Sequence, residues 1–376
     1  MIYFDNAATT LQKPNAVAES AFRAMRELSS PGRGGYPAAE KAAGIAFDCR
    51  SELQELFAAS SPEQIVFTLN ATHALNIAIK SLIPPGGCAV ISGYEHNAVT
   101  RPLAALDAKI LVADAPLFSV EEAVSAFRKA MLHSDVSAVI CSHVSNVFGY
   151  AHPVNAIGAL CREQGIPFIV DASQSAGILP LSMEESGASF IAMPGHKGLY
   201  GPQGTGVLVC RENIPVATLL EGGTGSRSAD VQMPVFLPDR LEAGTHNIPG
   251  IAGLLEGIRF VRKMGLGKIN RDERVLAAVA AEGLRQLPGI EVFSENGMFA
   301  QTGVLSFRHS GIDSETLGKK LSEKGVAVRT GLHCAPLAHK TAGTLESGTV
   351  RLSFSAFNTM EEVIQFLNIM DLLIRP

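Results

Sequence analysis

Lys197 lies in a glycine-rich connection between two apolar segments, and its side chain has the chemistry of a nucleophile. The segments before and after it, Ser189–Met193 and Gly206–Cys210, are short apolar runs typical of buried strands. A lysine in such a connection either extends its ammonium group into water or is desolvated. A desolvated, neutral amine can form an imine with a carbonyl cofactor. Because most loop lysines are solvated, Lys197 alone leaves both interpretations open.

A second candidate, Asp171, precedes Lys197 by 26 positions and closes the apolar run 167–171. Doubly wound α/β sheets bind their ligands at the carboxyl ends of strands, which is where this carboxylate is expected. In an enzyme that uses pyridoxal phosphate, an acid at this place keeps the pyridinium nitrogen protonated. An aspartate after a strand can equally be a helix cap, so the pair also leaves two interpretations.

Cys334 is the third candidate, because glycine and proline on either side of it predict a loop. The six cysteines, at positions 49, 88, 141, 161, 210 and 334, show no Cys-x-x-Cys and no paired spacing. They therefore indicate neither a zinc site nor a disulfide framework, and they favour a reducing cytoplasm. The other five lie in apolar or helical contexts typical of buried cysteines. Arg329 and His333 are cationic candidates that could lower the pKa of the Cys334 thiol.

The elements that must position these residues are predicted to form an α/β fold. From Thr68 to Asp171 the sequence alternates short apolar strands with helical patterns, which favours a mostly parallel sheet with helices on both faces. Near Gly250 the pattern changes to two long helices, followed by strands near Glu291 and Val304 and further helices. We expect a large domain of residues 15–250 and a smaller α+β domain of residues 251–376.

Composition excludes several other classes of protein. The chain has 376 residues, 47% of them hydrophobic, and a net charge of −5 without a basic stripe, which argues against nucleic acid and anionic membranes as partners. No targeting segment is expected, and the sequence has no apolar run of about 18 residues. The histidines include no His-Glu-x-x-His pattern or evident ligand cluster, so no metal is expected. The glycines of residues 198–206 do not match a nucleotide-binding loop.

Several ordered motifs resemble the class V aminotransferases, the fold-type I pyridoxal phosphate enzymes that include the cysteine desulfurases. The motifs are Asp171-Ala-Ser-Gln174, Gly195-His196-Lys197 and Gly201-Pro-Gln-Gly204, and the likeness runs from residues 5–10 to residues 351–359. The resemblance implies the fold-type I fold. It also implies that residues 1–14 pack with residues 251–376 as one small domain.

The resemblance implies a set of residues that bind pyridoxal 5'-phosphate. They are Ala71, Thr72, His96, Asn146, Asp171, Gln174, His196, Lys197 and Thr245. Thr72 matches the motif that holds the phosphate, although it could be an ordinary N-cap; a phosphate there would benefit from the helix dipole. His96 matches the residue that stacks on the ring, although a histidine after a strand is more often a surface residue. Thr245 matches a residue that reaches the phosphate from a partner subunit, which implies a homodimer.

The segment from Arg329 to Ala335 resembles the active-site loop of the cysteine desulfurases, with its Arg-x-Gly-x-x-Cys-Ala signature. The resemblance then implies that Cys334 receives the sulfur and that Lys197 and His96 are the other catalytic residues. Arg351 matches the arginine that binds the substrate carboxylate, for which a planar guanidinium is suited. Arg329 and Asn146 complete the expected substrate site.

The favoured function is therefore a cysteine desulfurase, which converts L-cysteine to L-alanine and leaves a persulfide on Cys334. Alternatives are a selenocysteine lyase acting on L-selenocysteine, another class V lyase or aminotransferase, and a non-catalytic scaffold that binds a sulfur-acceptor protein. The chain departs from the family pattern at three positions. These are Leu332 in place of a second histidine, Pro194 in place of a hydroxyl residue, and His246 in place of proline.

Overall fold

A seven-stranded sheet forms the centre of the computed structural model, which describes residues 1–31, 34–133, 135–295 and 299–374. Its strand order is β2-β8-β7-β6-β5-β3-β4. The strands are β2 (Ile65–Thr68), β3 (Cys88–Ser92), β4 (Lys109–Ala113), β5 (Val136–Ser142), β6 (Phe168–Asp171), β7 (Phe190–Pro194) and β8 (Gly206–Cys210). The five strands from β7 to β4 are parallel, and only β8 runs against its neighbours. The predicted mostly parallel sheet is confirmed.

Helices cover both faces of this sheet because alternate strand residues point to opposite sides. Val139 packs in one core with residues of α2, α5, α6 and α8, whereas its neighbour Ile140 packs in another core with residues of α3 and α4. The helices of this domain are α1 (Asn15–Glu27), α2 (Pro37–Phe57), η1 (Pro62–Gln64), α3 (Ala71–Leu82), α4 (Asn97–Ala105), α5 (Val120–Ala130), α6 (Val154–Gln164), α7 (Met183–Ser186) and α8 (Ile248–Met264).

The carboxyl ends of six strands meet at one edge of the sheet. Strands β3, β4, β5, β6 and β7 are parallel, and β2 has the same direction because it is antiparallel to β8, itself antiparallel to β7. Helices α3 and α4 begin at this edge, directly after β2 and β3. Asp171 ends β6 and the connection with Lys197 follows β7, so the fold brings both residues to the edge where such sheets bind ligands.

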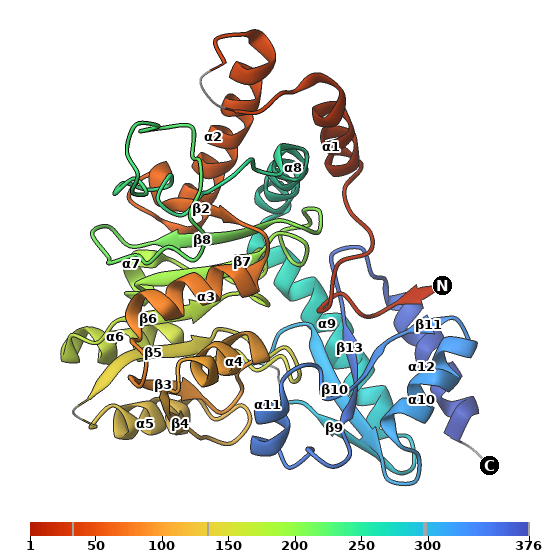
Figure 1. Ribbon diagram of the computed structural model, residues 1–376. Coiled ribbons are helices and arrows are strands. Elements are labelled where there is room, and N and C mark those ends of the chain that lie inside the picture. The colour runs from red at the N-terminus through yellow and green to blue at the C-terminus, as the bar shows by residue number, and fades with distance from the viewer. Residues whose placement is uncertain (32–33, 134, 296–298, 375–376) are drawn as a thin grey trace.

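A smaller unit lies beside the large sheet (Figure 1). Its antiparallel sheet has the order β12-β13-β10-β9, and β1 pairs in parallel with β11. Ile2 and Phe4 pack into the same core as α9, α10 and α12, which places the N-terminal strand with the C-terminal part of the chain. Its elements are β1 (Ile2–Tyr3), α9 (Leu266–Arg285), β9 (Ile290–Phe293), β10 (Val304–His309), α10 (Ser314–Glu323), β11 (Val326–Ala327), β12 (Arg329–Gly331), α11 (Pro336–Thr341), β13 (Thr349–Ser353) and α12 (Met360–Ile374).

The expected domain boundary at residue 250 falls within the first turn of α8. Ile251, Leu254 and Ile258 of this helix pack in the core of the large sheet, and α8 lies against α1 and α2. We propose that the division lies at Gly265, between α8 and α9, with residues 1–14 belonging to the small unit. None of the helices in the described ranges is both long and apolar enough to cross a membrane.

Candidate active site

A cavity of about 200 Å³ opens at the carboxyl edge of the large sheet. It lies where α3 and α4 begin and where the connection after β7 returns to the sheet. Its lining contains eight of the nine residues expected to bind a cofactor. The lining residues are Ala8, Asn70, Ala71, Thr72, His96, Ala98, Ser142, Val144, Asn146, Asp171, Ser173, Gln174, Pro194, His196 and Lys197.

Lys197 faces this cavity with an amine that is easier to deprotonate than an ordinary lysine. Burial lowers the pKa of Lys197 to about 8, against the opposing influence of Asp171. Asp171 is buried, and its Oδ1 accepts a hydrogen bond from the backbone N–H of Ser173 at 2.9 Å. Lys197 and Asp171, the expected nucleophile and acid, thus line the same cavity.

One end of the cavity offers donors for an anion. Asn70 caps α3 by accepting a hydrogen bond from the N–H of His73 at 2.9 Å, so Thr72 is not the cap. The N–H groups of Ala71 and Thr72, in the first turn, have no acceptor within the helix. The Nδ1 atom of His196 is buried without a hydrogen-bond partner in the described part of the chain. Burial lowers the pKa of His196 to about 4, so its ring is neutral at physiological pH.

His96 combines the two interpretations given to it from sequence. Its Nδ1 accepts a hydrogen bond from the N–H of Ala98 at 3.0 Å and so caps α4, which fixes the proton on Nε2. The same ring lines the cavity beside Asp171 and Lys197. Burial lowers the pKa of His96, while Asp171 opposes this shift. A neutral ring in this position can stack on an aromatic ligand.

Asn146 and Gln174 line the cavity and also tie neighbouring segments to it. The side-chain nitrogen of Asn146 donates to the carbonyl oxygen of His333 at 2.8 Å, next to Cys334. The side-chain nitrogen of Gln174 donates to the carbonyl oxygen of Ala7 at 3.0 Å. These two amides therefore join the large domain to the cysteine loop and to the N-terminal segment.

Arg351 is buried in the middle of β13, with 2% of its surface exposed. Its Nη1 donates to the carbonyl oxygen of Asn146 at 2.9 Å, and its Nη2 donates to Asp5 Oδ1 at 2.7 Å. Its Nε is buried without a partner in the ranges that the structure describes. Arg329 is Arg351's neighbour across the strand pair, and its Nη1 lies 3.9 Å from Asp5 Oδ2. Two guanidinium groups thus share one carboxylate beside the cavity.

Cys334 is exposed, whereas the other five cysteines are buried, as the sequence predicts. Its carbonyl oxygen accepts a hydrogen bond from the N–H of Asn97 at 2.8 Å, one residue after His96. The expectation that His333 supplies a positive charge to this thiol is wrong. Burial lowers the pKa of His333 well below its usual range, so the ring is neutral.

Thr245 lies apart from the cavity. It is exposed and lines a separate hollow of about 90 Å³ together with residues of the β2–α3 connection. Glu242 holds this loop, because its carboxylate accepts from Arg50 Nη2 at 2.6 Å and from the N–H of Phe67 at 2.7 Å. His246 Nε2 lies 3.2 Å from the same carboxylate. Within one chain, Thr245 is therefore not part of the Lys197 site.

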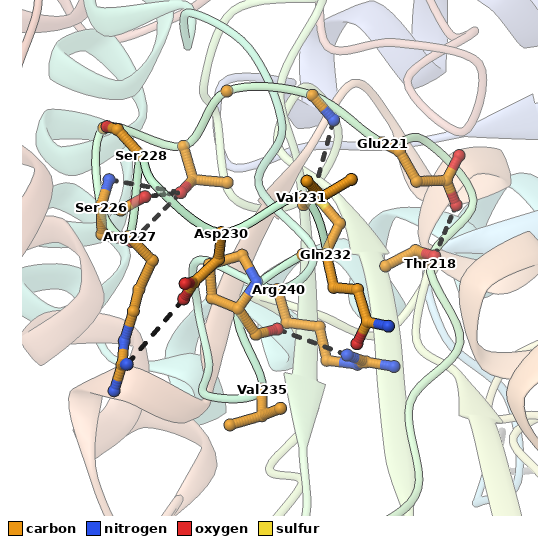
Figure 2. Close-up of a pocket in the computed structure, with 16 residues that line it drawn as sticks. Thr218, Glu221, Ser226, Arg227, Ser228, Asp230, Val231, Gln232, Val235 and Arg240 are labelled. Atoms are coloured by element: carbon orange, nitrogen blue, oxygen red, sulfur yellow. Dashed lines mark hydrogen bonds and ion pairs between the residues drawn. The ribbon is translucent and has the colours of Figure 1, made fainter.

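A larger cavity, of about 610 Å³, is formed by the segment 218–240 (Figure 2). Its charged groups pair locally, with Arg227 Nη1 3.9 Å from Asp230 Oδ2. Val231 and Val235 are largely exposed on the same segment. It contains no lysine, cysteine or histidine, so we assign the chemistry to the smaller cavity. The described residues contain no group of three or more His, Cys, Asp or Glu side chains arranged to hold a metal ion.

Sequence reasoning missed three polar residues near the site. Asp5 bridges the two arginines, and Ser173 lines the cavity. Glu95 is fully buried and accepts hydrogen bonds from the N–H of Ser142 at 2.8 Å and from its Oγ at 2.7 Å. Burial raises the pKa of Glu95 to about 7. Ser173 stands between the assigned residues Asp171 and Gln174, and Glu95 directly precedes His96, whereas Asp5 has no assigned residue beside it in the sequence.

This fold, with a lysine and a strand-end aspartate facing one cavity, defines a fold-type I transferase scaffold. The chain belongs to the aminotransferase class-V family, whose model matches residues 2–366. A probable cysteine desulfurase of Pyrococcus abyssi is 31% identical over 392 residues, which cover all of this chain and 94% of that protein. A probable cysteine desulfurase of Mycolicibacterium paratuberculosis is 34% identical over 98% of this chain, but the match spans only 54% of that longer protein.

Solved structures agree with the sequence relatives. The apo structure of a cysteine desulfurase from Thermococcus onnurineus NA1 has a TM-score of 0.91 and 32% sequence identity, and the match covers 99% of this chain and 94% of that chain. The predicted fold-type I class is confirmed.

Proposed function

We propose that this chain is a pyridoxal phosphate-dependent cysteine desulfurase that acts as a homodimer. The cavity residues fit the cofactor chemically. The first-turn N–H groups of α3 and the unpartnered Nδ1 of His196 suit its phosphate, and Asp171 suits its ring nitrogen. The amine of Lys197 suits its aldehyde, and the neutral ring of His96 suits its aromatic face.

Pyridoxal phosphate, when bound, draws electron density away from the reacting carbon atoms of the amino acid joined to it. The chain supplies the groups that bind and orient that amino acid. Arg351 has a fixed positive charge and an unpartnered Nε, which suits the α-carboxylate. Arg329 adds a second guanidinium at the same place. The amine of Lys197, with its pKa near 8, is suited to take the proton from Cα and to return it.

Cys334 provides the sulfur acceptor. Its sulfur forms a bond to the sulfur of L-cysteine while the Cβ–S bond of the substrate breaks. The electron pair of the broken bond stays with carbon, which takes a proton, so that L-alanine leaves and Cys334 becomes a persulfide. A thiol on a second protein then takes the terminal sulfur and restores the Cys334 thiol.

The observation that carries this proposal is the placement of the exposed Cys334. The backbone on either side of its Cα bonds to Asn97 and Asn146, which flank the cofactor cavity. An aminotransferase needs no thiol there. The relatives named as cysteine desulfurases share the family and nearly the whole length of this chain.

The test is a single-turnover reaction of the holoenzyme with L-cysteine in the absence of an acceptor. We expect one alanine per active site and a persulfide that peptide mapping places on Cys334. L-alanine formation without any persulfide, or pyruvate in place of alanine, would refute the desulfurase reaction. The same reaction with L-selenocysteine measures the preference between the two substrates.

A further inference from the structure

The backbone at Cys334 has an unusual conformation. His333 and Cys334 have φ angles of 52° and 56°, so two consecutive residues with side chains are left-handed. This region is disfavoured for residues other than glycine and is normally visited by single residues. Such a conformation persists only where surrounding contacts hold it.

Hydrogen bonds from the large domain hold the two carbonyl groups. Asn146 Nδ2 donates to the carbonyl oxygen of His333, and the N–H of Asn97 donates to the carbonyl oxygen of Cys334, both at 2.8 Å. These bonds fix the peptide groups on both sides of the thiol. They do not hold the side chain of His333, which has its own hydrogen bonds.

The ring of His333 belongs to a chain of hydrogen bonds with His339 of α11 and Thr344. His333 Nδ1 lies 3.2 Å from His339 Nε2, and His339 Nδ1 lies 2.7 Å from Thr344 Oγ1. At the other end, His333 Nε2 lies 3.4 Å from the carbonyl oxygen of Arg329. The two rings are within 13° of parallel with centroids 5.5 Å apart, which fits an edge-to-edge hydrogen bond and not face stacking.

The carbonyl oxygen of Arg329 determines which atom donates in each of these hydrogen bonds. The oxygen of Arg329 can only accept, so His333 Nε2 carries the proton and His333 Nδ1 accepts from His339 Nε2. His339 Nδ1 then accepts from the hydroxyl of Thr344. All polar atoms of the three side chains are satisfied only when both rings are neutral. Burial keeps them so, because it lowers the pKa of His339 to about 4 and that of His333 well below its usual range.

We propose that His339 and Thr344 are positioning residues for sulfur transfer. Through the ring of His333 they hold residues 333 and 334 in the left-handed conformation and so fix where the Cys334 thiol meets the substrate. The inference rests on the proposed desulfurase function. Both nitrogens of His333 are engaged away from Cys334, which excludes its ring as the base that deprotonates the thiol.

The first test removes the hydrogen bond between Thr344 and His339. Thr344→Val removes the hydroxyl, Thr344→Ser keeps it, and Thr349→Val removes a different buried hydroxyl, which bonds Ser306 Oγ at 3.2 Å. In Thr344→Val we expect kcat for alanine formation to fall about tenfold, with the KM for L-cysteine and the cofactor spectrum unchanged. Thr344→Ser and Thr349→Val should stay close to the wild type. Equal kcat values for Thr344→Val and Thr349→Val would overturn the proposal.

The second test uses the backbone itself. Glycine adopts a positive φ at no steric cost, whereas alanine does not. If the ring of His333 serves to hold this conformation, His333→Gly should keep several times more activity than His333→Ala. If the ring served proton transfer, the two variants would be equally impaired, and that result would contradict the proposal.

A third measurement separates this inference from the proposed function. The rate at which iodoacetamide alkylates Cys334 reports the position and environment of the thiol and requires no turnover. It should change in Thr344→Val and not in Thr349→Val. If the wild-type enzyme formed no alanine, the proposed desulfurase function would be refuted. The comparison of alkylation rates would still decide whether the hydrogen bonds from Thr344 to His333 position the thiol. Identical alkylation rates in both variants would refute the positioning role.

Discussion

Arg351 Nη2 and Asp5 Oδ1 lie 2.7 Å apart, although the two residues are 346 positions apart in the sequence. Arg351 sits directly opposite Arg329 on neighbouring antiparallel strands, where two like charges destabilise a sheet. Asp5 contacts both guanidinium groups and compensates this repulsion. The N-terminal segment thus sets how much positive charge remains for a substrate carboxylate.

Replacing Asp5 by Asn should change stability and ligand affinity in opposite directions. Arg351 is 2% exposed and Asp5 is 19% exposed, so the variant leaves a buried charge without its partner, at a cost of about 2–4 kcal/mol of unfolding free energy. A substrate carboxylate replaces part of the missing charge. The thermal shift produced by L-alanine should therefore be larger in Asp5→Asn than in the wild type.

A matched control for this variant is the exposed pair of Arg308 and Glu291, whose atoms lie 2.6 Å apart. Glu291→Gln should cost less than about 1 kcal/mol, because solvent screens this pair. An Asp5→Asn protein as stable as Glu291→Gln would show that Asp5 does not compensate Arg351.

The rate of cofactor attachment to the apoprotein should depend on the pKa of Lys197. Burial lowers this pKa to about 8, so the neutral amine accumulates as the pH rises through that value, well below the ordinary lysine value of 10.5. We expect the attachment rate, followed by absorbance, to have its midpoint near pH 8. Asp171 opposes the shift, so Asp171→Asn should move the midpoint lower.

Borohydride reduction and peptide mapping then identify the lysine that carries the pyridoxyl group. The label should appear on Lys197 and be absent from a Lys197→Ala protein. An attachment rate with its midpoint at the ordinary lysine pKa would contradict the desolvated state of this amine. A pyridoxyl label on another lysine would contradict the assignment of Lys197.

Much of the site could be predicted from sequence because it depends on local order. Strand ends and helix starts are visible as changes of hydrophobic pattern, and parallel strands carry their ends to one edge. Asp171 ends such a strand, and His96 and Lys197 follow two others, so their meeting in one cavity follows from the topology.

Contacts between distant segments could not be predicted in this way. Asp5 reaches Arg351 because residues 4 and 5 align with Ser353, a pairing that depends on the small domain core and not on local pattern. The neutrality of His333 also has no local signal. Only the packing of α11 reveals the burial of His333 and its bond to His339.

Changing Cys334 to Ala should separate cofactor chemistry from sulfur transfer. The variant keeps Lys197, Asp171 and Arg351, so cofactor binding and the spectral change on adding L-cysteine should remain. Alanine formation should fall by several orders of magnitude, because no other described thiol is exposed. Alanine release near the wild-type rate would favour a selenocysteine lyase or an elimination reaction.

The buried Cys88 provides the matched control for that variant. It lies at the start of β3 and is 2% exposed, and burial raises the pKa of its thiol. Cys88→Ala removes the same atoms from a site that sulfur cannot reach. Its alanine formation should stay close to that of the wild type.

The segment 218–245 supports the proposed homodimer. Leu220, Val231 and Val235 are exposed on it, Val231 and Val235 line the same cavity, and neighbouring exposed apolar side chains are typical of an interface. Thr245 extends from the end of this segment, on a loop that Glu242 holds in place. We therefore expect Thr245 to complete the cofactor site of a partner subunit.

Mixing two inactive variants tests whether Thr245 acts across subunits. Lys197→Ala lacks the reactive amine, and Thr245→Asp places a negative charge against the cofactor phosphate of the partner, so neither homodimer should form alanine. In a mixed dimer, one site combines the intact Lys197 of one subunit with the intact Thr245 of the other. Random pairing of equal amounts makes half of the dimers mixed, each with one intact site of two, so activity should recover to about a quarter of wild type. No recovery after subunit exchange, or full activity in a protein that sediments as a monomer, would refute the shared site.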